Sequence, residues 1–435
     1  MNILYLAHRI PYPPNKGDKL RAFRQIEQLS RNHRVWCACF VDDPRDTRHV
    51  VGLSQFCERL ITVELRPLQA KIRGLRWLLR GGTITEGYYA IRKMSAVLDD
   101  WQRTVDFDAV VAFSSSMASY ALGISAKRRI LDLCDLDSMK WSDYADHIAL
   151  NKRSGLCGRL VGSLYRAESH RLRASELRWI DRFDAAILAT EPEASLLRGL
   201  VPDRKLQIIG NGVEPASKES VPLTHSTIIP VVGFVGVMNY FPNVDAVIWF
   251  VHTCWPQIRK QLPSAEFRIV GRDPARSVRK LSRISGVRVV GEVPNAGHEL
   301  SRFDVSIAPL RIARGIQNKV LEAMAASKPV VLTPKAAQGI AAQDGRDYVV
   351  AESAAEIVQA VASLLRDSVL RNRIGASARE FVVQNRRWAP EMEKFEALVT
   401  GGAMTSAPID SLPMPIKQIA RGKSDRYEAA RAAEV

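Results

Sequence analysis

The sequence predicts an α/β protein with two doubly wound, parallel-sheet domains that face each other across a cleft. The chain has 435 residues, which is more than one ordinary hydrophobic core accommodates and therefore favours two domains. Apolar residues make up 46% and charged residues 25%, the balance of a folded globular protein. Short apolar runs alternate with amphipathic stretches along most of the chain, as expected when helices join parallel strands.

Residues 1–212 are expected to form the N-terminal domain. The opening MNILYLAH is predicted to be a buried strand, followed by a Pro/Gly-rich loop and an amphipathic helix that starts near Leu20. Four later apolar runs repeat the strand pattern: RVWCACFV, DAVVAFSS, RRILDLCDL and DAAILAT. Because helical stretches separate them, they predict a parallel sheet covered on both faces.

A polar stretch over residues 213–227 interrupts the alternation and is predicted to link the domains. The pattern restarts over residues 228–385, with strands IIPVVGFVG, FRIVG, VRVVGEV, VSIAPL and KPVVLT. Residues 386–400 are expected to form a helix that returns to the N-terminal domain. The segment 401–435 has too few large apolar residues for a core and is expected to be a disordered tail.

Composition limits the choice of location and partner. No run of eighteen apolar residues and no signal peptide is recognisable, and none of the six cysteines forms a CxxC pair, so a cytoplasmic protein with reduced thiols is expected. The formal net charge of +16 favours an acidic partner. Since the excess is present in both halves of the chain, nucleic acid is disfavoured against a phosphorylated substrate or anionic lipid.

The segment 68–82 adds a second way to meet an acidic partner. Leu68, Ile72, Leu75 and Leu79 share one helical face, and no acidic residue interrupts the surrounding lysine and arginines. Such a helix can lie on an anionic membrane surface. A core-packed helix with a solvated basic face explains the same pattern, and both interpretations stay open.

The loops after the strands are the expected ligand sites, since parallel sheets bind ligands at the carboxyl ends of their strands. In the first domain the loop NKGDK contains Gly17, which would let backbone amides approach an anion. An ordinary glycine turn is the alternative. Asp135 and Asp137 follow the strand RRILDLC and could orient a sugar, bind a metal or cap the next helix, with a metal the least favoured role.

In the second domain two loops have the same position. Gly233 and Gly236 bracket the end of the first strand and allow close approach to a phosphate, although the third glycine of a dinucleotide fingerprint is missing. Lys319 and Glu322 lie three residues apart at a predicted helix start, where a cation can hold a diphosphate and a carboxylate can accept from ribose hydroxyls. A surface ion pair would produce the same spacing.

These motifs together resemble a known family. The segments HRIPYPPNKGDKLR, IGNGVE, GFVGVMNYFPNVDA and RGIQNKVLEAMAASKPVV are similar to those of the retaining glycosyltransferases of family four, and more closely of the sugar transferases associated with PEP-CTERM exopolysaccharide systems. The resemblance covers roughly residues 1–400. It implies a GT-B fold of two Rossmann-like domains, a nucleotide-sugar donor on the second domain, an acceptor on the first, and no metal or other cofactor.

The resemblance also implies roles for particular residues. Lys319 would contact the diphosphate, Glu322 the ribose, and Gly17 the near side of the donor phosphates, while Asp135 would lie near the reacting sugar. Asp135 and Lys319 are the catalytic candidates. The remaining donor-side candidates are Gly236, Arg311, Arg314 and Gly315, and those on the acceptor side are Lys16, Asp18 and Asp137.

This chain also departs from the family pattern. Members carry two glutamates separated by seven residues, and Arg314 stands where the first would be. The Arg and Lys that follow the first strand of the second domain are missing too, with Val237 and Asn243 in that neighbourhood. Other cations would then have to bind the phosphates, and Arg311, Arg314 and Lys319 are the nearest.

The expected function is transfer of a hexose from a UDP- or GDP-sugar to a hydroxyl of a lipid-linked saccharide in exopolysaccharide synthesis, with retention. Two alternatives remain at this stage: a sugar-nucleotide epimerase of the same architecture, and a non-catalytic scaffold that binds a sugar nucleotide. No nucleic-acid partner is expected. The expected location is the cytoplasm, with peripheral contact at the inner membrane face as a variant of it.

Overall fold

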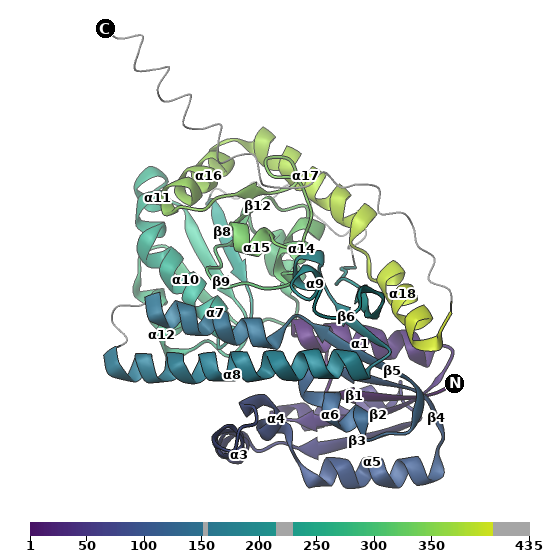
Figure 1. Cartoon of the computed structure of the whole chain (residues 1–435). Coiled ribbons are helices and arrows are strands. Elements are labelled where there is room, and N and C mark those ends of the chain that lie inside the picture. Colours follow the sequence, from purple (N-terminus) through teal and green to yellow (C-terminus); the bar gives the residue numbers. More distant parts are fainter. Residues whose placement is uncertain (151–154, 215–228, 403–435) are drawn as a thin grey trace. The chain divides into compact units, whose positions relative to one another are not determined.

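Two parallel sheets organise the chain in the computed structural model (Figure 1), which describes residues 1–150, 155–214 and 229–402. Met1–Ala403 form one compact unit. Most of the predicted linker 213–227 and nearly all of the predicted tail 401–435 lie outside the described residues. Below, the first lobe means residues 1–214 together with α18 (Trp388–Thr400), and the second lobe means residues 229–385.

The first sheet has seven strands in the order β3-β2-β1-β4-β5-β6-β7, all parallel to their neighbours. On β1, Leu4 lies opposite Trp36 on one side and Val110 on the other. The strands are β1 (Asn2–Ala7), β2 (Arg34–Val41), β3 (Arg59–Glu64), β4 (Phe107–Phe113), β5 (Ala126–Cys134), β6 (Ala185–Leu188) and β7 (Leu206–Ile208). Apolar clusters cover both faces of this sheet, which explains why its strands are apolar runs without alternation.

Helices cover the two faces of the first sheet. Its helices are α1 (Gly17–Ser30), α2 (Val50–Ser54), α3 (Pro67–Leu79), α4 (Ile84–Tyr89), α5 (Arg92–Thr104), α6 (Ala118–Leu122), α7 (Asp137–Leu150), α8 (Gly155–Arg182) and α9 (Glu191–Ser195). The first begins at Gly17, three residues before the predicted Leu20. Asp18 in its first turn favours this earlier start, because a carboxylate there stabilises the positive end of the helix dipole.

The second sheet has six parallel strands in the order β10-β9-β8-β11-β12-β13. They are β8 (Val231–Val235), β9 (Glu266–Val270), β10 (Val287–Gly291), β11 (Val305–Ala308), β12 (Val330–Leu332) and β13 (Val349–Val350). The helices are α10 (Phe241–Thr253), α11 (Trp255–Gln261), α12 (Arg276–Arg279), α13 (Ala296–Ser301), α14 (Asn318–Ala325), α15 (Pro334–Ala337), α16 (Ala354–Arg366) and α17 (Ser368–Asn385). Helices α10 and α11 are separated at Cys254, because Pro256 has no amide hydrogen to continue the helical ladder.

The last described helix, α18, packs on the first sheet. Trp388 and Phe395 are buried in the same cluster as Ile3 and Tyr5 of β1, and Figure 1 shows α18 close to α1. The Glu396 carboxylate accepts a hydrogen bond from Gln28 Nε2 at 2.6 Å. The predicted fold class, two doubly wound parallel-sheet domains, is confirmed.

Candidate functional site

The carboxyl end of β8 brings three of the donor-side segments together. A Cβ atom on Gly236 would lie 2.8 Å from Asn243 Nδ2 of α10, so only glycine leaves that amide its place. Asn243 Oδ1 in turn accepts a hydrogen bond from Lys319 Nζ at 3.0 Å. The loop after β8, the start of α10 and the start of α14 therefore meet at Lys319.

Lys319 and Glu322 are half-buried residues with shifted pKa values. Burial lowers the pKa of Lys319 to about 8 and raises that of Glu322 to about 7, and the attraction between the two opposes both shifts. The Lys319 Nζ atom also lies 5.7 Å from the centre of the Phe234 ring. Because burial disfavours its charge, Lys319 would be stabilised as a cation by an anion bound next to it.

Arg272 is a cation at this site that the sequence interpretation missed. It follows β9 by two residues, and its backbone oxygen accepts a hydrogen bond from Met238 N at 2.9 Å, which places it beside the loop after β8. Within the described residues, its Nε and Nη2 atoms are buried and have no hydrogen-bond partner. The closest carboxylate oxygen is that of Asp273, 3.7 Å from Nε. Buried guanidinium donors without partners are unfavourable, so this group is suited to receive an anionic ligand.

The Gly17 loop of the first lobe adds a second cation near Arg272. The pKa of Lys16 is lowered by burial and further by the positive charges of Arg9 and Arg272. Like charges from both lobes are therefore close enough to repel each other. An anion between them would remove this repulsion.

Gly17 itself faces the start of α14. A Cβ atom there would lie 3.2 Å from Asn318 Nδ2, and that nitrogen is buried with no hydrogen-bond partner among the described residues. Asn318 Oδ1 accepts from Asn211 Nδ2 at 3.0 Å. Asn211 is held by Arg21, which is fully buried and donates to Asn211 Oδ1 at 2.9 Å and to Asp132 Oδ2 at 2.9 Å.

Asp135 and Gly315 meet where the two lobes touch. Gly315 has φ +59°, and a Cβ atom on it would lie 1.9 Å from Asp135 Oδ1. That oxygen is buried and has no hydrogen-bond partner in the described part of the chain. Burial, together with the nearby Glu193 carboxylate, raises the pKa of Asp135 to about 7. A carboxyl group that titrates near neutral pH can exchange a proton with a bound substrate.

Arg314 and Arg311 already have carboxylate partners. Arg314 donates from Nε to Asp143 Oδ2 at 2.6 Å and from Nη1 to Glu193 Oε1 at 2.9 Å, so it joins the second lobe to the first. Arg311 Nη2 pairs with Asp245 Oδ1 at 2.5 Å. Unlike these two arginines, Lys319 and Arg272 donate no hydrogen bond to a carboxylate within the described residues.

The acceptor-side candidates lie at the carboxyl edge of the first sheet. Asp18 Oδ2 accepts from Arg9 Nη1 at 2.7 Å, and this guanidinium holds the pKa of Asp18 far below its usual range despite burial. Asp137 is the first residue of α7, and its Oδ2 accepts from Ser115 Oγ at 2.5 Å. Hydrogen bonds from first-lobe side chains thus hold both carboxylates in place.

The described residues contain neither a metal-binding cluster nor a membrane-spanning helix. No group of three or more His, Cys, Asp or Glu side chains is arranged to hold a metal ion there. Nor is any helix within residues 1–150, 155–214 and 229–402 both long and apolar enough to cross a membrane.

Comparison with known proteins yields one family and many similar structures. Residues 229–367 match the family described as Glycosyl transferases group 1, and no curated protein matches. Three similar solved structures each align with 92% of this chain. Anabaena Alr3699/HepE in complex with UDP-glucose has a TM-score of 0.64 and 13% identity over 100% of its own chain, and sucrose-phosphate synthase from Thermosynechococcus elongatus has a TM-score of 0.66 and 16% identity over 98%. WaaG, a glycosyltransferase involved in lipopolysaccharide biosynthesis, has a TM-score of 0.61 and 19% identity over 100%.

Because the sequence identities are low, the similar structures establish only the fold of this chain. The type of domain in the second lobe is indicated by the family match. The chain has the two-domain GT-B fold, and its second lobe carries a Glycosyl transferases group 1 domain, which supports a GT-B glycosyltransferase.

Proposed function

We propose that this protein transfers a hexose from a nucleotide diphosphate sugar to a saccharide hydroxyl, with retention at the anomeric carbon and without a metal. UDP- and GDP-sugars are the donors proposed, and a lipid-linked saccharide used in exopolysaccharide synthesis is the acceptor. The complexes of Alr3699/HepE with UDP and UDP-glucose support a uridine nucleotide for a protein of this architecture. The remaining support comes from the chemistry of the site.

The observation that carries the proposal is a set of cations around the loop after β8 that, within the described residues, donate no hydrogen bond to a carboxylate. Lys319 contacts Asn243 at the start of α10, and Arg272 has two buried donor atoms without partners in the same part of the chain. Lys16 approaches from the first lobe. A diphosphate between them would satisfy these donors and neutralise their charges.

The reaction follows from this charge distribution. As the bond between the anomeric carbon and the diphosphate oxygen breaks, its electron pair leaves with the diphosphate, and the fixed cations stabilise that growing charge. The acceptor oxygen forms the new bond to the anomeric carbon on the same face. Its proton passes to the departing phosphate oxygen. Asp135, with a pKa of about 7, lies at the contact between the lobes and would orient the sugar.

Replacing Lys319 tests the assignment. In the variant Lys319→Ala we expect donor affinity to fall at least about 10-fold, because one charge-assisted contact worth about 1.5–3 kcal/mol is lost. Calorimetric titration with UDP- and GDP-sugars measures this. Lys260→Ala is the matched control, since Lys260 is exposed on α11. Wild-type donor affinity and transfer rate in Lys319→Ala would refute the proposal.

A second candidate is a scaffold that binds a sugar nucleotide without transferring it. The observation in its favour is Arg314, which occupies the position of the first family glutamate and is bound by Asp143 and Glu193. Donor binding without release of nucleoside diphosphate, with any saccharide acceptor, would favour the scaffold. Conversion of the UDP-sugar with no acceptor present would instead indicate an epimerase.

A further inference from the structure

Helix α3 exposes a continuous apolar stripe to solvent. Leu68, Ile72, Leu75 and Leu79 are 74%, 58%, 46% and 79% exposed, and their spacing places them on one side of the helix. The helix is anchored through a different side, where Ala70, Gly74 and Leu78 are buried. Four large aliphatic side chains in one exposed row are more than scattered surface residues, and such rows mark interaction surfaces.

Positive charge flanks this stripe on both sides. At 100° per residue, Lys71 lies along one edge of the stripe, and Arg76 and Arg80 lie along the other. All three are exposed, and the sequence from Leu65 to Thr85 contains no acidic residue. The apolar row and the cations therefore form one amphipathic surface without local compensation of charge.

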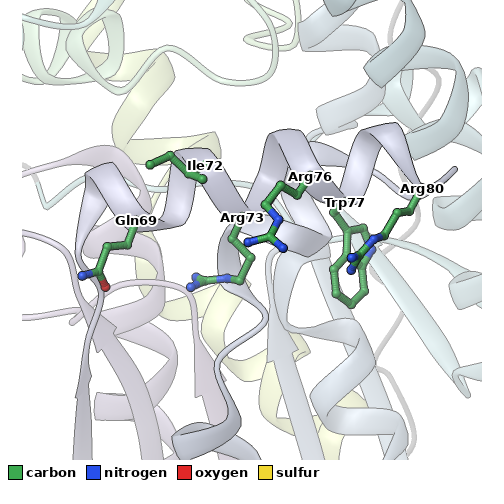
Figure 2. A pocket seen from close by; sticks show the side chains of 6 residues that line it. All are labelled: Gln69, Ile72, Arg73, Arg76, Trp77 and Arg80. Carbon is green, nitrogen blue, oxygen red and sulfur yellow. The ribbon is translucent and has the colours of Figure 1, made fainter.

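A shallow pocket of about 390 Å³ lies beside the stripe. Figure 2 shows the side chains that line it, five from α3 and one from the residue that follows it: Gln69, Ile72, Arg73, Arg76, Trp77 and Arg80. Arg73 is fixed by donating to the backbone oxygens of Gly87, at 2.7 Å, and of Tyr88. Trp77 is 41% exposed at the pocket. A tryptophan beside arginines is suited to the polar–apolar boundary of a bilayer.

We propose that this face of α3 binds the surface of an anionic phospholipid bilayer. The helix axis lies in the membrane plane, the four aliphatic side chains enter the boundary between headgroups and acyl chains, and the arginine pocket receives a lipid phosphate. Charge complementarity selects a membrane over a protein partner, because cations border the apolar row on both sides and the whole chain carries a formal charge of +16. The inference is independent of the proposed transferase reaction.

Vesicle sedimentation tests this surface with two pairs of variants. We expect the full chain to sediment with vesicles that contain phosphatidylglycerol and to be released by high salt. The double variants Ile72→Gln/Leu79→Gln and Arg76→Glu/Arg80→Glu should each weaken binding at least about 10-fold, through lost apolar burial and reversed charge respectively. Their controls are Val369→Gln and Arg366→Glu/Arg373→Glu, which change exposed residues of the second lobe in the same ways and should bind like the wild type.

Three outcomes would overturn the proposal. The first is sedimentation that does not fit the proposal: either the wild-type protein does not sediment with anionic vesicles, or the α3 variants sediment with them as the wild type does. Another is a wild-type dimer in solution that the α3 variants dissociate, which would make the face a protein interface. The third is a thermal shift with inorganic phosphate that depends on Arg76 and Arg80 while vesicles have no effect, which would identify a site for a free anion. Unchanged melting temperatures of the variants ensure that lost binding is not unfolding.

Discussion

Replacing Arg272 by alanine is expected to weaken donor binding while leaving the unliganded fold as stable as before or slightly more so. Its Nε and Nη2 atoms are buried and have no hydrogen-bond partner among residues 1–150, 155–214 and 229–402, so a bound diphosphate can gain two charge-assisted hydrogen bonds of about 1.5–3 kcal/mol each. The smaller value gives a loss of about 3 kcal/mol in Arg272→Ala, or about 100-fold in the dissociation constant.

The same substitution should stabilise the unliganded fold, although it weakens donor binding. Without a ligand, Arg272 has two donors that no described residue satisfies, and the like charge of Lys16 lies nearby. Removing the guanidinium should therefore raise the unfolding free energy by about 0–1 kcal/mol. A gain in stability with a loss of binding is typical of a group placed for function.

Two measurements on purified protein check both signs. Calorimetric titration with UDP- and GDP-sugars gives the dissociation constant, and urea unfolding without ligand gives the stability. Arg288→Ala on the neighbouring strand β10 is the control, since Arg288 is exposed. Unchanged donor affinity in Arg272→Ala would refute the reasoning, and so would a stability loss of several kcal/mol, which would give Arg272 a structural role.

Three further outcomes follow from the same site. Donor affinity should be highest between about pH 7 and 8, because below this range Glu322 takes up a proton and above it Lys319 loses one. The variant Glu322→Gln should abolish the decrease in affinity on the acid side. A donor affinity that does not change with pH in calorimetric titrations would contradict this prediction. Gly315→Ala should lower the unfolding free energy by about 1–2 kcal/mol in urea denaturation, since φ is +59° and the new Cβ would overlap Asp135. An unchanged midpoint would argue against that contact. Arg314→Glu restores the family residue, yet we expect a lower melting temperature and no increase in transfer rate. The reason is that the new carboxylate would face the carboxylates of Asp143 and Glu193, which bind the arginine. An increased transfer rate would show this expectation to be wrong.

The two sheets could be predicted because each strand is a local apolar run, and the order of strands and helices fixes a parallel sheet. The position of Lys319, Glu322 and Gly236 after strands could also be predicted from this order. The start of the first helix was less accurately predicted: it lies at Gly17 and not near Leu20, because a carboxylate in the first turn favours the earlier start.

The partners of the arginines could not be predicted, since they depend on contacts between distant parts of the chain. Arg314 pairs with Asp143, 171 residues away, and with Glu193, 121 residues away. Arg272 directly follows the predicted strand FRIVG, and its place at the carboxyl end of a parallel strand is the sequence signal for a ligand contact there. Its unpartnered nitrogen atoms, however, are a property of the folded chain alone.

The contacts that lead from Asp132 through Arg21 and Asn211 to Asn318 have a consequence for movement between the lobes. Asn211 cannot shift without breaking a hydrogen bond to a guanidinium in the core of the first lobe. Its side chain is therefore fixed relative to that lobe. Asn318, at the start of α14, accepts a hydrogen bond from the Asn211 side chain. Movement of the second lobe relative to the first would therefore have to turn about this hydrogen bond or break it, and would also have to preserve or break the ion pairs of Arg314.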